Sequence, residues 1–238
     1  KGGHLLTISS EEENEFIKSA GVMHSWMGLV SSSVNLEEPD ICGDNYIEVD
    51  GNCYWADDYS ALENFGDYFE EEPNLLDICN LSWNEEGRLT VLNCSTLGLT
   101  GEIPSEVYEL EYLEELWFDN NNIEGEIPWD ILELYNLEIL YLNGNSLEGE
   151  IPSDIEMLEN LRGVHLNDNQ LEGEIPNFAE SLTHLRLENN NFDYIDESFC
   201  DIYDNLYDFN ISNNNICPSY PSCIEDNIGN QNTGNCSY

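Results

Sequence analysis

Apolar residues recur along the middle of the chain at a nearly constant interval. Six segments share the pattern L-x-x-L-x-L-x-x-N-x-L, with few substitutions, and start 24, 24, 24, 21 and 24 residues apart. Each segment predicts one short strand whose first, fourth and sixth side chains point inward. One segment cannot bury these side chains alone, so successive segments must stack. The segments open at Leu89, Leu113, Leu137, Leu161, Leu182 and Leu206.

Asparagine occupies the ninth position in five of the six segments, whereas the first segment has Leu97 there. An inward amide can bond to turn backbone that is otherwise unpaired, so we predict a structural role for Asn121, Asn145, Asn169, Asn190 and Asn214. Four segments continue as Gly-Glu-Ile-Pro, which predicts an apolar contact followed by a rigid extended turn. The segment at Leu182 lacks this continuation and the unit before it is three residues shorter, so we expect a changed outer structure there.

These motifs resemble secreted leucine-rich-repeat proteins, specifically the 24-residue G-x-I-P subclass, over roughly residues 88–217. The resemblance implies a solenoid of about six repeats, with short parallel strands on the concave face and an irregular or 3-10 convex side. It also implies an N-terminal cysteine-containing cap at 41–87, repeats at 88–205, and a last repeat with a cysteine cap at 206–238.

Eight cysteines gather in two terminal clusters, which predicts disulfides and an extracellular location. Cys42 and Cys53 flank a predicted hairpin, and residues 57–67 form a predicted helix with Leu62 and Phe65 inward. The resemblance to the repeat family's N-terminal cap covers the pair Cys79 and Cys94. Three pairings stay open among the remaining cysteines, which are Cys200, Cys217, Cys223 and Cys236.

Residues 1–40 do not follow the repeat. Residues 2–17 and 26–29 resemble the first strand-to-helix segment and the next strand of a C-type-lectin-like domain. This implies a partial lectin-like extension, and with it calcium-dependent carbohydrate binding as an alternative function. The chain opens with Lys1 instead of Met, so we expect a processed or truncated product.

The charge balance excludes several partners. With 50 acidic and 5 basic residues the formal net charge is −45, which argues against nucleic acid and against anionic membrane surfaces. No apolar run approaches the ~18 residues of a transmembrane helix, so no membrane span is expected. Aromatic residues make up 11% of the chain and the leucines are regular, which argues against disorder.

Glutamates occupy equivalent positions in successive repeats and form two columns. Strands stacked about 4.8 Å apart would bring these carboxylates close, at a cost of about 1 kcal/mol per neighbour in water. Two interpretations stay open: a solvated acidic coat, or carboxylates bridged by divalent cations such as Ca²⁺. No other cofactor is expected. The columns are Glu102, Glu126, Glu150 and Glu174, and Glu124, Glu148 and Glu172.

Aromatic and charged residues follow one another on the predicted concave face. Positions three, five and seven of each strand face this side, and the fifth positions of four neighbouring strands are large. Two interpretations stay open: a contact patch for a partner, or side chains that merely cover the sheet. The candidate binding residues are Trp117, Tyr141, His165 and Arg186, with Asp119 and Glu188 at seventh positions.

Four Asn-x-Ser sequons are candidate glycosylation sites in a secreted eukaryotic chain, and chance matches in a bacterial one. They are Asn80, Asn93, Asn210 and Asn235.

No catalytic constellation is visible, because the four histidines are scattered and no His, Cys or Asp cluster has metal-ligand spacing. We therefore predict a non-enzymatic extracellular binding or structural scaffold that acts through protein–protein contacts. The partner is either another protein or copies of the chain, in which case divalent cations would help a fibre or layer to assemble. The alternative, calcium-dependent carbohydrate binding, would use the lectin-like part or the stripe of Trp117 and Tyr141.

Overall fold

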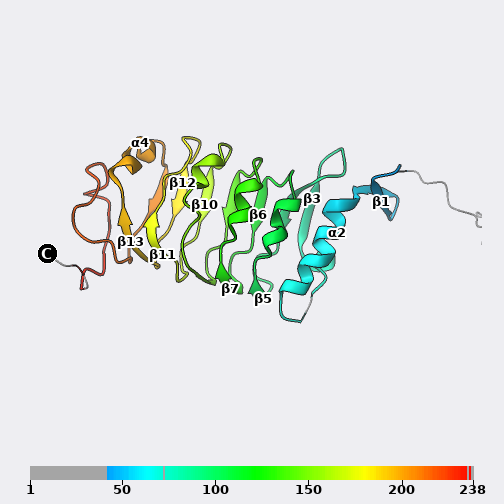
Figure 1. Ribbon diagram of the computed structural model, residues 1–238, viewed down its shortest axis with the longest axis horizontal. Helices are drawn as coiled ribbons and strands as arrows, with labels where there is room; N and C mark the ends of the chain where they lie inside the picture. The colour runs from blue at the N-terminus through cyan, green and yellow to red at the C-terminus, as the bar shows by residue number, and fades with distance from the viewer. Residues whose placement is uncertain (1–41, 72, 235, 237–238) are drawn as a thin grey trace, which may run out of the picture. The chain divides into compact units, whose positions relative to one another are not determined.

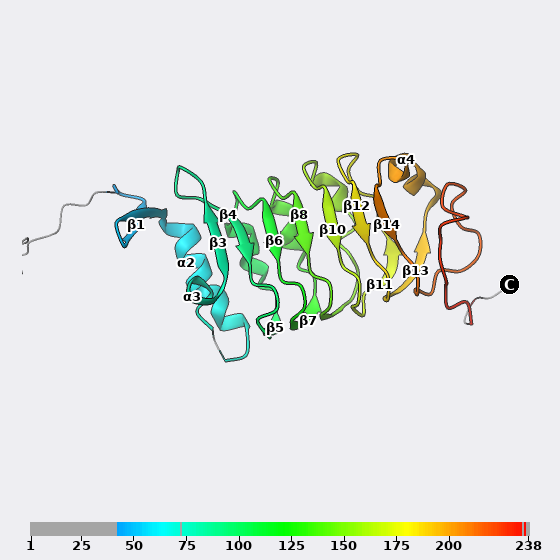
Figure 2. The same ribbon diagram turned by 180° about the vertical axis from the view of Figure 1, so that it is seen from behind.

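The computed structural model describes residues 42–71, 73–234 and 236. These residues coil repeatedly, and the coils stack side by side (Figures 1 and 2). All of the described residues belong to one compact unit. The predicted lectin-like segment, residues 1–40, lies outside the described residues.

A seven-stranded sheet runs along one side of the coils and faces the viewer in Figure 2. Each repeat contributes one strand, and the fourth positions Leu92, Leu116 and Leu140 lie in register on successive strands. All neighbours in this sheet are parallel except β3 and β4. In spatial order the strands are β14 (Asp208–Asn210), β12 (His184–Arg186), β10 (Gly163–His165), β8 (Ile139–Tyr141), β6 (Glu115–Trp117), β4 (Leu89–Asn93) and β3 (Asn80–Trp83).

The other side of the coils carries short strands and 3-10 helices. Pro104 and Pro128 immediately precede the helices η3 and η4 with φ near −64°, the value that the proline ring imposes. The predicted irregular convex side is therefore confirmed. Its elements are β5 (Thr100–Glu102), η3 (Ser105–Glu109), β7 (Asn122–Glu126), η4 (Trp129–Glu133), β9 (Ser146–Glu148), η5 (Ile155–Met157), β11 (Glu172–Ile175), β13 (Asn191–Ile195), η6 (Glu197–Phe199) and α4 (Cys200–Tyr203).

The shortened unit changes this outer side, as its sequence predicts. The three units before it each carry a 3-10 helix, whereas residues 176–183 contain no helix. The outer strands also divide here into one sheet of β5, β7 and β9 and another of β11 and β13. The loss of three residues removes the length that would otherwise form the helical turn.

The core consists of the apolar positions that the repeat predicts. The first, fourth and sixth positions are buried in the first five repeats, but Leu206 and Phe209 of the last repeat are only partly buried. A ladder of buried asparagines runs beside them. Asn169 Nδ2 donates to the carbonyls of Leu142 and Leu166, and its Oδ1 accepts from the Leu147 amide, all at 3.0 Å. The predicted inward amides are thus confirmed.

The N-terminal cap is a hairpin followed by short helices. Disulfides join Cys42 to Cys53 and Cys79 to Cys94, and the predicted inward residues Leu62 and Phe65 are buried. The elements are β1 (Tyr46–Val49), β2 (Asn52–Trp55), α2 (Ala56–Phe65), η2 (Gly66–Tyr68) and α3 (Leu75–Ile78).

A buried ion pair joins this cap to the first repeat, and the sequence pattern does not reveal it. Asp58 in α2 is fully buried and accepts from Arg88 Nε at 3.0 Å, from Arg88 Nη2 at 2.9 Å and from the Leu89 amide at 2.8 Å. The guanidinium lies 5.0 Å from the ring of Trp55 and 4.1 Å from the ring of Tyr112. These contacts anchor α2 against the first strand of the parallel sheet.

The C-terminal cap settles the open cysteine pairing, with disulfides Cys200–Cys223 and Cys217–Cys236. Its Gln231 takes the position that the asparagine of a following repeat would hold. Gln231 Nε2 donates to the carbonyls of Ile211 and Ile228 at 2.9 and 2.8 Å, and its Oε1 accepts from the Ile216 amide at 3.3 Å. The cap therefore ends the asparagine ladder with the backbone of the last turn still paired.

Candidate functional site

The candidate site is a row of side chains at the fifth strand positions on the concave face. Parallel pairing puts Trp117, Tyr141, His165 and Arg186 on successive strands β6, β8, β10 and β12. Alternation along each strand points them away from the core. All four are partly buried, which means that they pack against one another as well as facing solvent.

Three of these residues form a continuous ring stack. The rings of Trp117 and Tyr141 meet edge to face at 4.6 Å, and those of Tyr141 and His165 are parallel at 4.0 Å. Gly163, at the third position of its repeat on β10, makes room for this arrangement, because a Cβ there would lie only 3.2 Å from the Tyr141 hydroxyl oxygen. The glycine therefore helps to fix where the Tyr141 ring lies.

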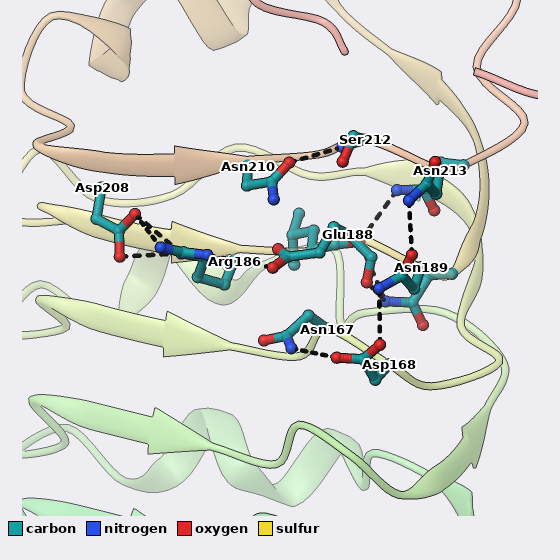
Figure 3. Close-up of polar contacts among 12 residues, drawn as sticks. Asn167, Asp168, Arg186, Glu188, Asn189, Asp208, Asn210, Ser212 and Asn213 are labelled. Atoms are coloured by element: carbon teal, nitrogen blue, oxygen red, sulfur yellow. Dashed lines mark hydrogen bonds and ion pairs between the residues drawn. The ribbon is translucent and has the colours of Figure 1, made fainter. Parts of the chain in front are cut away.

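Arg186 continues the row and is held by two carboxylates (Figure 3). Its Nε lies 2.9 Å from both carboxylate oxygens of Asp208, and its Nη1 lies 3.3 Å from Glu188 Oε1. Sequence reasoning singled out Arg186 and Glu188 but not Asp208. Asp208 occupies the third position of the last repeat, on the neighbouring strand β14, and this concave-facing position was the signal that could have found it.

Burial shifts the pKa values of two of the stacked side chains, and two polar atoms beside them have no hydrogen-bond partner among the described residues. Desolvation lowers the pKa of the His165 imidazole despite the opposing influence of Asp208, and desolvation also raises the pKa of the Tyr141 hydroxyl. His165 Nε2 and Glu188 Oε2 are buried and have no hydrogen-bond partner among the described residues. Unpaired buried polar atoms are uncommon in folded proteins, so these two mark where a ligand could supply hydrogen bonds.

A chain of polar side chains borders the row at the ends of the strands. In Figure 3, Asn213 donates to Asn189 at 2.8 Å, and both Asn189 and Asn167 donate to Asp168, at 2.7 and 2.6 Å. Asp119, at the same border, accepts hydrogen bonds from Ser95 Oγ and Asn120 Nδ2. Most polar atoms of this border thus have partners within the chain.

The repeats identify the fold. A family model described as Leucine Rich Repeat matches residues 112–134, 136–158 and 181–202. The described residues have the leucine-rich-repeat solenoid fold.

Solved structures similar to this leucine-rich-repeat solenoid are ectodomains of plant receptor kinases and a plant peptide hormone receptor. The leucine-rich-repeat ectodomain of SOBIR1 from Arabidopsis thaliana is 29% identical with a TM-score of 0.58, and the match covers 67% of this chain and 93% of that one. The ectodomain of Arabidopsis HAESA, in complex with an N-terminally extended IDA peptide hormone, is 29% identical with a TM-score of 0.55, over 58% of this chain and 24% of that one. RGFR1, a plant peptide hormone receptor in complex with RGF2, is 28% identical with a TM-score of 0.53, over 57% and 22%. This solenoid therefore spans nearly all of the SOBIR1 chain but under a quarter of the other two. A search of curated protein sequences found no match.

The glutamates of both columns are exposed, and all but Glu150 lie on the outer strands of the leucine-rich-repeat solenoid. Strand register places Glu102 opposite Glu124 and Glu126 opposite Glu148, which differs from the column-on-column stacking that the repeat spacing predicts. Neighbouring carboxylates across strands thus come from different columns. Within the described ranges, no three His, Cys, Asp or Glu side chains converge as a metal-binding group, and calcium bridging stays a prediction.

Three of the four sequons lie at the two ends of the seven-stranded sheet. Asn80 and Asn93 are directly opposite on β3 and β4, so glycans on both would compete for the same space. Asn93 and Asn210 each accept a hydrogen bond at 3.1 Å, from the amides of Ser95 and Ser212. Asn235 lies outside the described residues, and glycosylation stays a prediction. In the part of the chain that the structure describes, each helix is too short or too polar to cross a bilayer.

Proposed function

We propose that this leucine-rich-repeat solenoid is a non-enzymatic extracellular scaffold whose concave face binds an extended protein segment. The observation that carries the proposal is the row of Trp117, Tyr141, His165 and Arg186, in which one ring nitrogen of His165, like one carboxylate oxygen of the adjacent Glu188, is buried without a hydrogen-bond partner among the described residues. Rigid aromatic side chains and arginine are the residue types that contribute most binding energy in protein interfaces.

The unpaired atoms favour a ligand that carries hydrogen-bond donors. Glu188 Oε2 accepts only, and His165 Nε2 accepts when the ring is protonated at Nδ1. Because the pKa of His165 is lowered, the ring is neutral at neutral pH and keeps one accepting nitrogen. Backbone amides of an extended peptide would supply donors along the strand direction while its side chains pack on the aromatic rings.

The similar solved structures support a protein ligand. The HAESA ectodomain is in complex with a peptide hormone ligand, and RGFR1, a plant peptide hormone receptor, is in complex with RGF2. Four disulfides within the described residues fit an oxidising extracellular setting. Since the match spans under a quarter of either receptor, the ligands of HAESA and RGFR1 do not identify the ligand of this chain.

Selection of phage-displayed random 12-residue peptides tests this proposal. We expect wild-type protein to enrich peptides that lose at least tenfold in affinity against Trp117→Ala or Tyr141→Ala, which corresponds to about 1.4 kcal/mol. The matched control is Tyr194→Ala, an exposed tyrosine on the outer strand β13. Peptides that bind wild type and the Trp117 and Tyr141 variants equally would refute a concave binding site.

Self-association is one form of this function, and calcium-dependent carbohydrate binding is the alternative to it; each has its own test. Self-association would appear in light scattering as growth beyond the monomer in Ca²⁺ and salt, and a monomer under all conditions would count against it. Carbohydrate binding predicts a calcium-dependent signal on a glycan array that Trp117→Ala reduces. An array without such a signal would remove that alternative.

A further inference from the structure

Two shallow depressions lie next to each other on the helical side of the solenoid. The helices α2, η3 and η4 pack in a row there, with α2 coloured cyan and the two helical turns green in Figure 1. The depression between α2 and η3 has a volume of about 370 Å³, and the one between η3 and η4 about 350 Å³. Both depressions lie on the opposite side of the solenoid from the concave row. A ligand in the depressions therefore leaves the concave row accessible.

Tyrosines and carboxylates dominate the lining of both depressions. Five lining residues are acidic and none is basic, and the four tyrosines are between 38% and 51% exposed. We call the tyrosines and carboxylates that line the two depressions the tyrosine–carboxylate surface. Its tyrosines are Tyr68, Tyr108, Tyr112 and Tyr135, and its carboxylates are Asp67, Glu106, Glu109, Glu111 and Glu133.

Hydrogen bonds hold tyrosine hydroxyls beside carboxylates on this surface. The Tyr135 hydroxyl donates to Glu133 Oε2 at 2.9 Å. A hydrogen bond to Glu106 raises the pKa of Tyr68 and lowers that of Glu106. Each pairing places a negative charge at the edge of an exposed ring, which is an arrangement that attracts a planar cation to the ring face.

The chain already binds one arginine in this way. The guanidinium carbon of Arg88 lies 4.1 Å from the centre of the Tyr112 ring, and its Nη2 lies 3.9 Å from Glu111 Oε2. Tyr112 and Glu111 also line the depression between η3 and η4. An internal arginine thus demonstrates the geometry that the neighbouring tyrosines offer to an external one.

We propose that the tyrosine–carboxylate surface binds arginine side chains of a basic partner protein. A guanidinium stacks on the ring of Tyr108 or Tyr135 and bonds to Glu133 in the same depression. Arginine is favoured over lysine because its planar, weakly hydrated group stacks on aromatic rings and pairs with carboxylates in a fixed geometry. The net charge of −45 draws basic partners to the protein from a distance.

Fluorescence anisotropy with labelled hexa-arginine and hexa-lysine peptides at about 150 mM salt tests the proposal, because the two peptides carry equal charge. We expect hexa-arginine to bind at least fivefold more tightly. The double variant Tyr108→Ala/Tyr135→Ala should weaken hexa-arginine binding about tenfold, because it removes two cation–π contacts, and should change hexa-lysine binding less than about twofold.

Two further variants serve as controls. Tyr207→Ala removes an 86% exposed tyrosine outside both depressions and should leave both affinities unchanged. Circular dichroism of each variant verifies the fold. Equal binding of the two peptides, or equal effects of the double variant and Tyr207→Ala, would mean that only general charge attraction operates and would overturn the proposal. A loss in Trp117→Ala that matches the double variant would place the peptide on the concave face and would also overturn it.

Discussion

Replacing one amide of the asparagine ladder should destabilise the solenoid strongly. In Asn169→Ala the buried Leu147 amide loses its acceptor, and the carbonyls of Leu142 and Leu166 each lose one donor. Those two carbonyls keep a second donor, from Asn145 at 3.0 Å and Asn190 at 2.9 Å. The backbone of the turn is therefore only partly deprived of partners.

The expected loss in the free energy of unfolding follows from the number of hydrogen bonds that Asn169→Ala removes. An unsatisfied buried donor costs about 1–3 kcal/mol and each lost hydrogen bond about 0.5–1.5 kcal/mol, so the free energy of unfolding should fall by about 2–6 kcal/mol. Asn167→Ala is the matched control. Its amide lies on the concave border and donates to the exposed Asp168 at 2.6 Å, so we expect a change below about 0.5 kcal/mol.

Urea unfolding followed by circular dichroism, with disulfides intact, measures both variants. Since each repeat contacts only its neighbours, a smaller dependence on urea concentration would show that part of the array unfolds separately. If Asn169→Ala loses no more stability than Asn167→Ala, the ladder does not support the turns and the reasoning is wrong.

Three further predictions concern other parts of the chain. Asp58→Ala removes the buried partner of Arg88 and leaves it the more distant, exposed Glu111 at 3.9 Å, so the free energy of unfolding measured in urea should fall by about 3–5 kcal/mol; a loss below about 1 kcal/mol would contradict this account. Burial lowers the pKa of His165 below its usual value of 6.5, so the unfolded chain takes up that proton first and stability falls as the pH drops below about 6.5. His165→Gln should therefore flatten the pH dependence of urea unfolding between about pH 7 and 5.5, and an unchanged profile would refute it. If divalent cations bridge the glutamate columns, millimolar Ca²⁺ should raise the melting temperature above that in chelator, and equal melting curves with no association would end that interpretation.

Local spacing predicts most of the solenoid. The first, fourth and sixth positions of a repeat find their partners one repeat away, so a regular interval suffices to assign the strands and the core. The same regularity predicts the inward amide of Asn169, because the turn of every repeat has backbone amides and carbonyls that need the same side-chain partner. It predicts the row of Trp117, Tyr141 and His165 on neighbouring strands as well.

The sequence by itself thus determined a stacked array of repeats, its core, its ladder and the face on which the aromatic row lies. Only the tertiary structure decided the pairing of Cys200 with Cys223, the ion pair of Asp58 with Arg88, and the contact of Asp208 with Arg186. It alone placed Tyr68, Tyr108, Tyr112 and Tyr135, which lie in or just after the short helices η2, η3 and η4, around neighbouring depressions. The physical reason is that repeated apolar positions have one consistent way to be buried. Single charged, aromatic and cysteine side chains have many potential partners, and the folded backbone selects among them by distance and direction.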